Sequence, residues 1–405
     1  MHRIVSPVRL AIFALLGAAA GGAAVGGAAQ AAKGGGDAAL QTTLAQPAPE
    51  GAVAVAVETL ADGLANPWSL AFLPNGDVLV TERAGRLRII RDGALVDAPV
   101  AGVPEIYVGG TSWSQAGFFD VVADPDFAEN DTVFIAYAHG TARRNGLRVA
   151  RARFVDDALV DVTPIYDAAP PKDTPLHYGG RLAIGADGMV YVSIGEGARY
   201  KERAQDYATS YGAVVRITKD GAIPDDNPPF DKSDARPELY SKGHRNPQGL
   251  AFDPETGTLW EHEHGAKGGD EINRVEPGAN YGWPLATYGV DYNGARISPF
   301  TTYEGTVQPV KYWTPSIAPS GLAVYRGDLF PEDWAGDLLV GGLVSRALHR
   351  VDMDGAAPVG EERYLADLGE RIREVRVGPD GAIYATTEER GGEPVGKVLR
   401  ITPAQ

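Results

Sequence analysis

The stretch "LAFLPNGDVLVTE", residues 70–82, places one apolar run on either side of a Pro-Asn-Gly-Asp turn. Asn and Gly adopt the backbone conformations that a tight turn requires, and the flanking runs are typical of β-strands. No sustained helical periodicity competes with this pattern. The stretch therefore predicts a β-hairpin.

The same pattern returns five more times along the chain. The repeats are "VVADPDFAENDTVFIAYA" from Val121, "LAIGADGMVYVSIG" from Leu182, "LAFDPETGTLWEHE" from Leu250, "LAVYRGDLFPEDWAGDLLVGG" from Leu322 and "VRVGPDGAIYATTE" from Val375. Their spacing of roughly 50–70 residues matches propeller blades that carry insertions. The sequence thus predicts an all-β, six-bladed β-propeller. A pair of β-sandwiches is the alternative, but it would not explain the sixfold recurrence.

The two ends of the propeller are expected to meet in one blade. "AVAVAVETL" at residues 52–60 and "KVLRI" at residues 397–401 both have strand composition. Pairing them would close the ring and remove exposed sheet edges. We therefore expect one catalytic propeller domain over residues 51–405.

The first 31 residues have the features of a secretory signal peptide. Arg3 and Arg9 precede an apolar run at residues 10–25, and "AQA" at residues 29–31 is a cleavage signal. A membrane anchor is the alternative, although the run is short and Gly-rich for a span. Residues 32–50 are small and polar, as in a flexible leader. We expect a periplasmic or secreted protein that does not span the membrane after signal removal.

The amino-acid composition indicates which kinds of binding partner can be expected. The chain has no cysteine, so its core must hold it without disulfides, and it is long enough to bury one. Its 37 basic and 53 acidic residues give a formal charge of −16, or −18 without residues 1–31, which hold two arginines and no acid. Such an acidic surface repels nucleic acid, so no nucleic-acid partner is expected.

The stretch "GHRNPQGLAFDPETGTLWEHEHGAKGGDEIN", residues 243–273, carries several chemical groups. Arg245 and Asn246 are fixed by the following proline, and a guanidinium suits carboxylate or carbonyl oxygens. The loop "GAKGGDEIN" is rich in carbonyl and carboxylate oxygens, which favour calcium. His262 and His264, with a glutamate between them, suggest a transition metal instead, but a third soft ligand is missing.

Three other loops offer single polar candidates. Gln115 lies in "GTSWSQAGFFDV", His177 in "PLHYGGRLAIG" and Glu196 in "SIGEGARYKERAQDY". Glycines beside His177 would let a ligand approach the backbone, and a histidine can act as a base near neutral pH. Each residue also has a structural interpretation: a turn amide, a hydrogen-bonded loop histidine and a solvated charge.

An arginine pair occurs near the end of the chain. Arg371 and Arg373 are two apart on an expected strand and so share one face. Trp313 lies in a Pro-rich turn, and an aromatic plane near two arginines suits a flat, anionic ring system. The alternative is a surface ladder with Glu370 and Glu374.

Five motifs occur together in this chain: "GHRNPQGLAF", "DEIN", "NYGWP", "HYGGRLAIG" and "APSG". With this combination, the chain resembles the soluble pyrroloquinoline-quinone (PQQ) dehydrogenases of sugars from about residue 64 to residue 401. The resemblance implies oxidation of aldoses at C1 to the lactone, with PQQ and calcium as cofactors. It also implies that electrons pass to an external acceptor, a quinone or a cytochrome.

The resemblance also implies roles for individual residues. His177 would be the catalytic base, with Glu196 beside it, and Arg245 would stabilise charge on the quinone oxygens. The implied PQQ contacts are Gln115, His177, Arg245, Asn246, Trp313, Arg346, Arg371 and Arg373, with Thr314 in place of Trp313 if the alignment moves by one residue. The implied calcium ligands are the carbonyls of Gly265 and Ala266, with Asp270 as the supporting acid.

Four departures separate the chain from the glucose-specific branch of that family. Val344 stands where the branch has a lysine, for which Arg346 is the candidate substitute. Glu196 replaces an aspartate, Ala266 replaces a proline, and a long insertion before "APS" is missing. The aldose sugar dehydrogenases are therefore the closer match. Two other readings of the sequence are a six-bladed calcium-dependent lactonase or esterase, and a non-catalytic propeller that binds a glycan or a protein.

Overall fold

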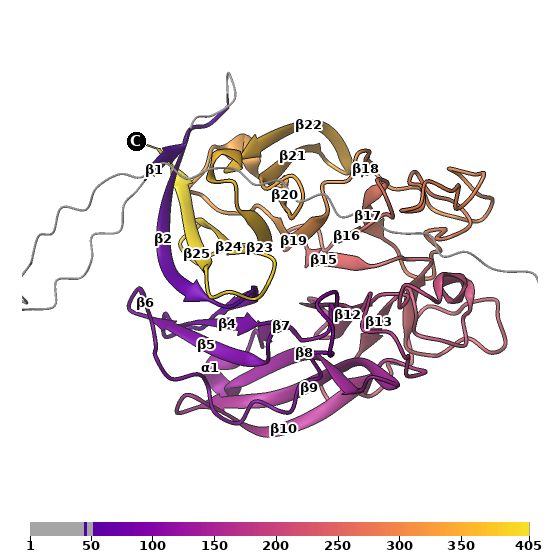
Figure 1. Cartoon of the computed structure of the whole chain (residues 1–405), viewed down its shortest axis with the longest axis horizontal. Helices are drawn as coiled ribbons and strands as arrows, with labels where there is room; N and C mark the ends of the chain where they lie inside the picture. Colours follow the sequence, from indigo (N-terminus) through magenta and orange to yellow (C-terminus); the bar gives the residue numbers. More distant parts are fainter. Residues whose placement is uncertain (1–43, 47–51, 405) are drawn as a thin grey trace, which may run out of the picture. The chain divides into compact units, whose positions relative to one another are not determined.

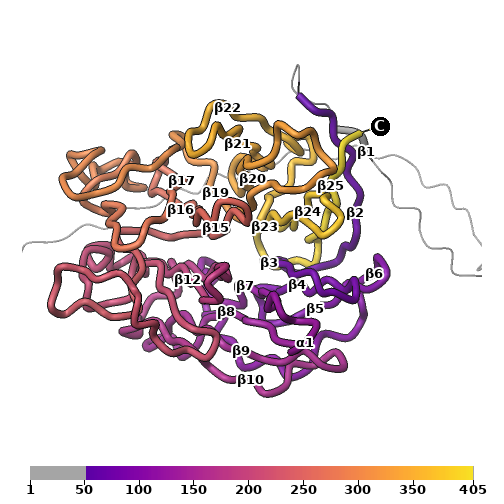
Figure 2. Tube along the Cα trace, turned by 180° about the vertical axis from the view of Figure 1, so that it is seen from behind, coloured from indigo at the N-terminus to yellow at the C-terminus, as the bar shows by residue number. Residues whose placement is uncertain are grey.

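The computed structural model describes residues 44–46 and 52–404 of the chain. In this part the regular structure is almost entirely β-strand, arranged as six antiparallel sheets that follow one another along the chain (Figures 1 and 2). Each sheet is one blade, which confirms the predicted six-bladed propeller. The predicted signal peptide, residues 1–31, lies outside the described residues, as does the leader except for residues 44–46.

Five blades contain four strands each. The first holds β3 (Pro67–Phe72), β4 (Val78–Glu82), β5 (Arg86–Arg91) and β6 (Ala94–Leu95). The second holds β7 (Phe118–Ala123), the short helix α1 (Phe127–Asn130), β8 (Thr132–Thr141), β9 (Arg144–Val155) and β10 (Ala158–Asp167). The third holds β11 (Gly179–Ile184), β12 (Val190–Ile194), β13 (Ala213–Ile217) and β14 (Leu239–Lys242).

The next two blades follow the same order. The fourth holds β15 (Pro247–Phe252), β16 (Leu259–Glu263), β17 (Asp270–Val275) and β18 (Lys311–Trp313). The fifth holds β19 (Pro319–Val324), β20 (Leu338–Gly342), β21 (Leu348–Asp354) and β22 (Ala357–Tyr364). Short 3-10 turns occupy Lys201–Gln205, Glu332–Trp334 and Ala366–Leu368.

The sixth blade joins the two ends of the propeller, as predicted. Its strands lie in the order β1 (Leu44–Gln46), β2 (Val55–Leu64), β25 (Gly396–Pro403), β24 (Ile383–Glu388) and β23 (Arg371–Val377). Val57 of β2 pairs with Ile401 of β25. β1 adds three residues of the expected leader to the outer edge of this sheet, because that edge of β2 offers unpaired backbone N–H and C=O groups.

The six predicted hairpins are the two inner strands of the six blades. The innermost strands β3, β7, β11, β15, β19 and β23 neighbour one another in a closed ring. Each of them has a register shift against its hairpin partner near its first residues. Such bulges redirect side chains locally, so the starts of these strands can present polar groups to the propeller axis.

Apolar side chains between neighbouring blades form the core. Phe134 of β8 and Val192 of β12 are fully buried in one cluster, and Leu339 of β20 and Ile372 of β23 in another. Burial of this kind stabilises the ring by about 25 cal/mol per Å² of apolar surface removed from water. No helix among the described residues is long and apolar enough to cross a membrane.

Candidate active site

A cavity of about 600 Å³ opens where the innermost strands begin. Its wall includes residues at the start of four of these strands: Trp68, Gly179, Gln248 and Arg371. Eight residues named from the sequence line it: Gln115, Asn246, His264, Gly265, Ala266, Val344, Arg371 and Arg373. The structure therefore brings together candidates from four separate parts of the chain.

His177 and Glu196 form a buried pair beside this cavity. His177 lies just before β11 with a left-handed φ of 47°, and Glu196 follows β12. The Nδ1 atom of His177 is 3.0 Å from Oε1 of Glu196. The backbone N–H of His177 donates to Oε1 of Gln115 at 2.8 Å. Because Gln115 lines the cavity, this bond ties the histidine turn to the cavity wall.

Burial and the neighbouring charges together set the protonation of this pair. Burial lowers the pKa of His177, although the Glu196 carboxylate acts in the opposite direction. Burial also opposes ionisation of Glu196, but His177 and Arg245 outweigh it and the pKa of that carboxyl is lowered. An ionised carboxylate can only accept, so Nδ1 of His177 carries the proton and donates. Nε2 keeps its lone pair, and no described residue hydrogen-bonds to it.

The Arg245–Asn246 turn is held from behind by Glu263 of β16. Oε2 of Glu263 accepts the backbone N–H of both residues, that of Asn246 at 3.2 Å. The Arg245 guanidinium donates to the carbonyl of His264 at 3.0 Å and lies 5.2 Å from the ring of Trp283. Its Nε is buried without a partner in the described chain. Arg245 thus retains a donor beside the cavity, although it does not line the wall.

Arg371 and Arg373 share one buried carboxylate, that of Glu388 at the end of β24. The closest approaches to Oε1 of Glu388 are 3.1 Å for Arg371 and 2.8 Å for Arg373. The surface-ladder alternative is wrong, because both arginines are buried, Glu370 pairs with Lys397, and Glu374 pairs with Arg181 and Arg376. Two guanidinium groups against one carboxylate leave excess positive charge on the cavity wall.

Asp270 supports the loop that carries Gly265 and Ala266. Its Oδ1 accepts the backbone N–H of Gly265 at 2.9 Å. Its Oδ2 accepts the N–H groups of Ile317 and Ala318, each at 2.9 Å, and the Ser316 hydroxyl. Both carboxylate oxygens are therefore engaged. Asp270 joins two loops of the cavity wall, and Gly265 and Ala266 line that wall.

Four of the predicted cofactor contacts are not among the residues that line the cavity: His177 and Arg245, which lie beside it, and Trp313 and Arg346. Trp313 of β18 is buried in the core, and its Nε1 donates to Glu361 at 3.1 Å. Thr314, its one-residue alternative, accepts the N–H of Gly269 at 3.1 Å. Arg346 is half exposed and pairs with Glu389 at 2.7 Å, and only Glu389 lines the cavity. The predictions for Trp313 and Arg346 came from the resemblance alone, which cannot show where a side chain points.

Other aromatic and polar residues line the wall instead. They were not predicted as site residues from the sequence: Trp68, Arg83, Trp113, Tyr178, Gln248, Tyr292 and Glu388. Trp68 and Glu388 flank or end predicted hairpins, so their position in the repeat was the signal that could have identified them.

His262 and His264 do not bind a metal through Nε2. Nε2 of His262 lies 2.9 Å from the carbonyl of Gly321, and Nε2 of His264 lies 2.8 Å from the carbonyl of Pro319.

The fold and the site together define a propeller enzyme that carries a buried histidine–carboxylate pair beside one polar, arginine-rich cavity. Comparison with known proteins makes this more specific. The family model described as Glucose / Sorbosone dehydrogenase matches residues 64–400. The chain belongs to this family and is an oxidoreductase.

Individual relatives agree with this assignment. The aldose sugar dehydrogenase YliI of Escherichia coli is 41% identical over 355 residues, covering 86% of this chain and 93% of that protein. The crystal structure of the soluble aldose sugar dehydrogenase from Escherichia coli in the apo-form has a TM-score of 0.81 at 40% identity, covering 86% of this chain and 100% of that one. The PQQ-bound aldose sugar dehydrogenase from Streptomyces coelicolor has a TM-score of 0.68 at 27% identity, covering 88% of this chain and 99% of that one.

Proposed function

We propose that this protein oxidises aldose sugars at C1 to the corresponding lactones, with PQQ and calcium as cofactors. The observation that carries the proposal is the buried pair of neutral His177 and ionised Glu196 beside a cavity with two arginines. The names of the relatives support the substrate class and the quinone. The lactonase alternative would leave the arginine pair without a role.

The residues present fit PQQ, a flat molecule with three carboxylates. Arg371 and Arg373 offer the excess positive charge that carboxylates require, and Gln115 and Asn246 offer amides on the same wall. A volume of about 600 Å³ is in the range of small-molecule sites. The Gly265 and Ala266 carbonyls suit a calcium ion, which prefers oxygen ligands. Asp270 would hold that loop in place rather than bind the ion.

When bound, PQQ supplies the two-electron acceptor that takes hydride from the sugar C1 carbon. His177 takes the proton from the C1 hydroxyl at Nε2, the nitrogen that Glu196 leaves free. The Glu196 carboxylate stabilises the imidazolium that results. The Arg245 guanidinium stabilises negative charge that develops near the cavity wall. Loss of the proton and the hydride converts the sugar to its lactone.

Electrons must then leave the enzyme, and we infer an external quinone or cytochrome as the acceptor. We also infer a periplasmic or secreted location from the signal-peptide features of residues 1–31. On this inference the sugar is oxidised outside the cytoplasm.

The variant His177→Ala tests the proposal. PQQ and calcium are added to wild type and variant, and dye reduction is measured with a panel of aldoses. We expect turnover across several sugars in the wild type, and in the variant a loss of at least about 100-fold with PQQ binding retained. Near-normal turnover in the variant would remove His177 from the mechanism.

A further inference from the structure

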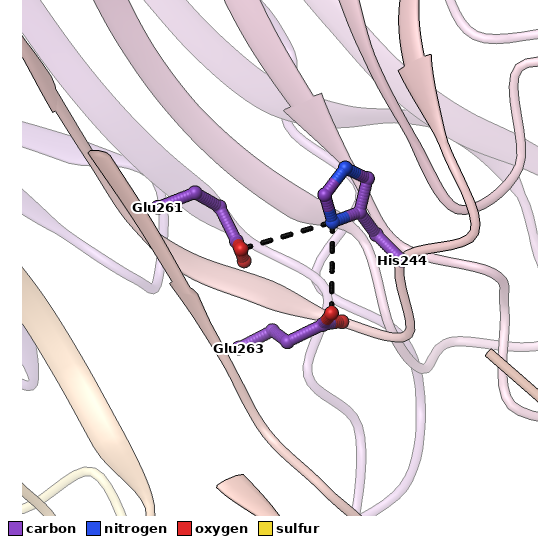
Figure 3. A group of neighbouring side chains, drawn as sticks. All are labelled: His244, Glu261 and Glu263. Atoms are coloured by element: carbon purple, nitrogen blue, oxygen red, sulfur yellow. Dashed lines mark ion pairs between the residues drawn. The ribbon is translucent and has the colours of Figure 1, made fainter. Parts of the chain in front are cut away.

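A second cluster of reactive side chains lies behind the active-site turn. Glu261 and Glu263 are two apart on β16 and therefore share one face of the sheet. His244 comes from the segment between β14 and β15 and points at both carboxylates, as Figure 3 shows. All three side chains are buried, His244 and Glu261 completely. None of them lines the cavity described above.

The distances in this cluster are too long for direct hydrogen bonds. Nδ1 of His244 is 3.5 Å from Oε1 of Glu263 and 3.7 Å from Oε2 of Glu261. Nδ1 of His244 and Oε1 of Glu261 have no hydrogen-bond partner within the described chain. Ligands that surround a zinc ion tetrahedrally lie about 3.3–3.5 Å apart. The three ligand atoms all lie within 4.8 Å of one another, so one ion can bridge them with small adjustments.

Neighbouring groups orient each of the three side chains. Nε2 of His244 lies 2.8 Å from the Ser241 hydroxyl, and its ring stacks on Tyr281. A proton on Nε2 that donates to Ser241 leaves a lone pair on Nδ1 for a metal. Asn273 donates to Glu261 at 3.0 Å. The backbone of Arg245 and Asn246 donates to Glu263.

The negative charge of the two carboxylates also favours a bound cation. No lysine or arginine of the described chain forms an ion pair with Glu261 or Glu263, and His244 is their sole possible cationic partner there. Two buried carboxylates without a counter-ion are strongly unfavourable. A divalent cation would neutralise both.

We propose that His244, Glu261 and Glu263 form a metal site for a first-row divalent cation, with zinc as the best fit. An imidazole nitrogen with two carboxylates favours zinc over calcium, which takes oxygen ligands. The site is distinct from the Gly265 and Ala266 carbonyls. The ion would fix Glu263, whose other oxygen holds the Arg245–Asn246 turn, so its role is structural. The binding claim does not depend on the proposed function.

Zinc uptake by the full-length protein tests the site. The protein is kept in excess calcium, so that oxygen-only sites are filled, and zinc is added in steps. Bound zinc is measured by elemental analysis after gel filtration, and affinity by competition with a chromophoric chelator. We expect one zinc per wild-type chain that calcium does not displace. We expect Glu261→Gln, which keeps the size of the side chain, to bind this zinc at least about tenfold more weakly.

Glu361→Gln is the matched control. His349 and Glu361 also form a His–Glu pair, but Nδ1 and Oε1 are 2.7 Å apart, which leaves no room for an ion. We expect this variant to bind zinc like the wild type. Absence of zinc binding by the wild type, or equal affinity in Glu261→Gln, would overturn the proposal and indicate that a proton neutralises Glu261 instead.

Anomalous diffraction from zinc-soaked wild-type crystals gives an answer even if Glu261→Gln fails to fold. The proposal predicts a peak between Nδ1 of His244 and the two carboxylates. Zinc peaks at other positions alone would contradict it.

Discussion

Replacing Glu196 by glutamine tests the electrostatic part of the proposed mechanism. Glutamine has nearly the same size and can still accept a hydrogen bond from Nδ1 of His177, which lies 3.0 Å from the carboxylate. It removes the charge, and its NH2 group replaces Oε2, which accepts the backbone N–H of Ala198. A hydrogen bond to a charged group contributes about 1.5–3 kcal/mol and a neutral one about 0.5–1.5 kcal/mol. The exchange therefore removes about 1–1.5 kcal/mol from the imidazolium that forms as His177 takes the proton, which is about tenfold in rate.

The pH profile gives a second, independent expectation. The Glu196 carboxylate raises the pKa of His177, against the larger lowering by burial. Without this charge the pKa of His177 falls further, so the neutral, basic form persists to lower pH. The acid limb of kcat/KM should therefore move to lower pH in Glu196→Gln, while the activity above that limb falls.

The assay is dye reduction with an aldose at saturating PQQ and calcium, from pH 4 to pH 9, with PQQ affinity measured separately. Glu202→Gln is the matched control, because this glutamate lies in the same loop and is exposed. The control should leave rate and pH profile unchanged. A Glu196→Gln variant with the wild-type rate and an unmoved acid limb would refute the assignment of His177 and Glu196 as base and orienting acid.

Three further expectations concern the cofactors and the fold. Arg373→Gln should weaken PQQ binding by about 10- to 100-fold, since it removes one charged hydrogen-bonding group, and an unchanged Kd in a fluorescence titration would count against the arginine pair. Removal of calcium should abolish turnover and lower the Tm, because an ion bound only to the native state stabilises it; full activity with no metal left by elemental analysis would argue against calcium. Gly321→Ala should lower the free energy of unfolding by at least about 2 kcal/mol, because φ is 72° and an added Cβ would lie 2.5 Å from the nitrogen of Val375; denaturant curves that match the wild type would contradict this.

The inner half of each blade was predictable from the sequence, whereas the outer half was predicted only in the sixth blade, from residues 52–60 and 397–401. The inner strands are buried between neighbouring blades and flank tight turns, so they combine apolar runs with turn residues. Outer strands such as β10, Ala158–Asp167, are half exposed and carry mixed residues and irregular register. Their composition does not distinguish them from loops.

The residues of the candidate site also divide into those that the sequence could predict and those that it could not. Gln115, Asn246, Arg371 and Arg373 were identified by local motifs, and the fold places them on one cavity. Glu388 was not identified, because its pairing with both arginines crosses between two strands of one blade. Motifs report what is close in sequence, whereas this contact depends on the register of the sheet.

The sequence "EHEH" at residues 261–264 illustrates how register changes an interpretation. The two histidines suggested a transition-metal site from the residue types alone. In the structure Glu261 and Glu263 share the face that meets His244, while His262 lies on the other face and contacts Gly321. The third ligand comes from the segment before β15, which no local spacing could indicate.

The most direct test of the central claim is an equilibrium titration of the metal-free apoprotein with PQQ, with and without calcium, followed by addition of an aldose. We expect PQQ binding that is tighter with calcium, and a loss of the absorbance of the oxidised quinone when the sugar is added. No PQQ binding in the presence of calcium, or binding without reduction by any aldose of the panel, would contradict it.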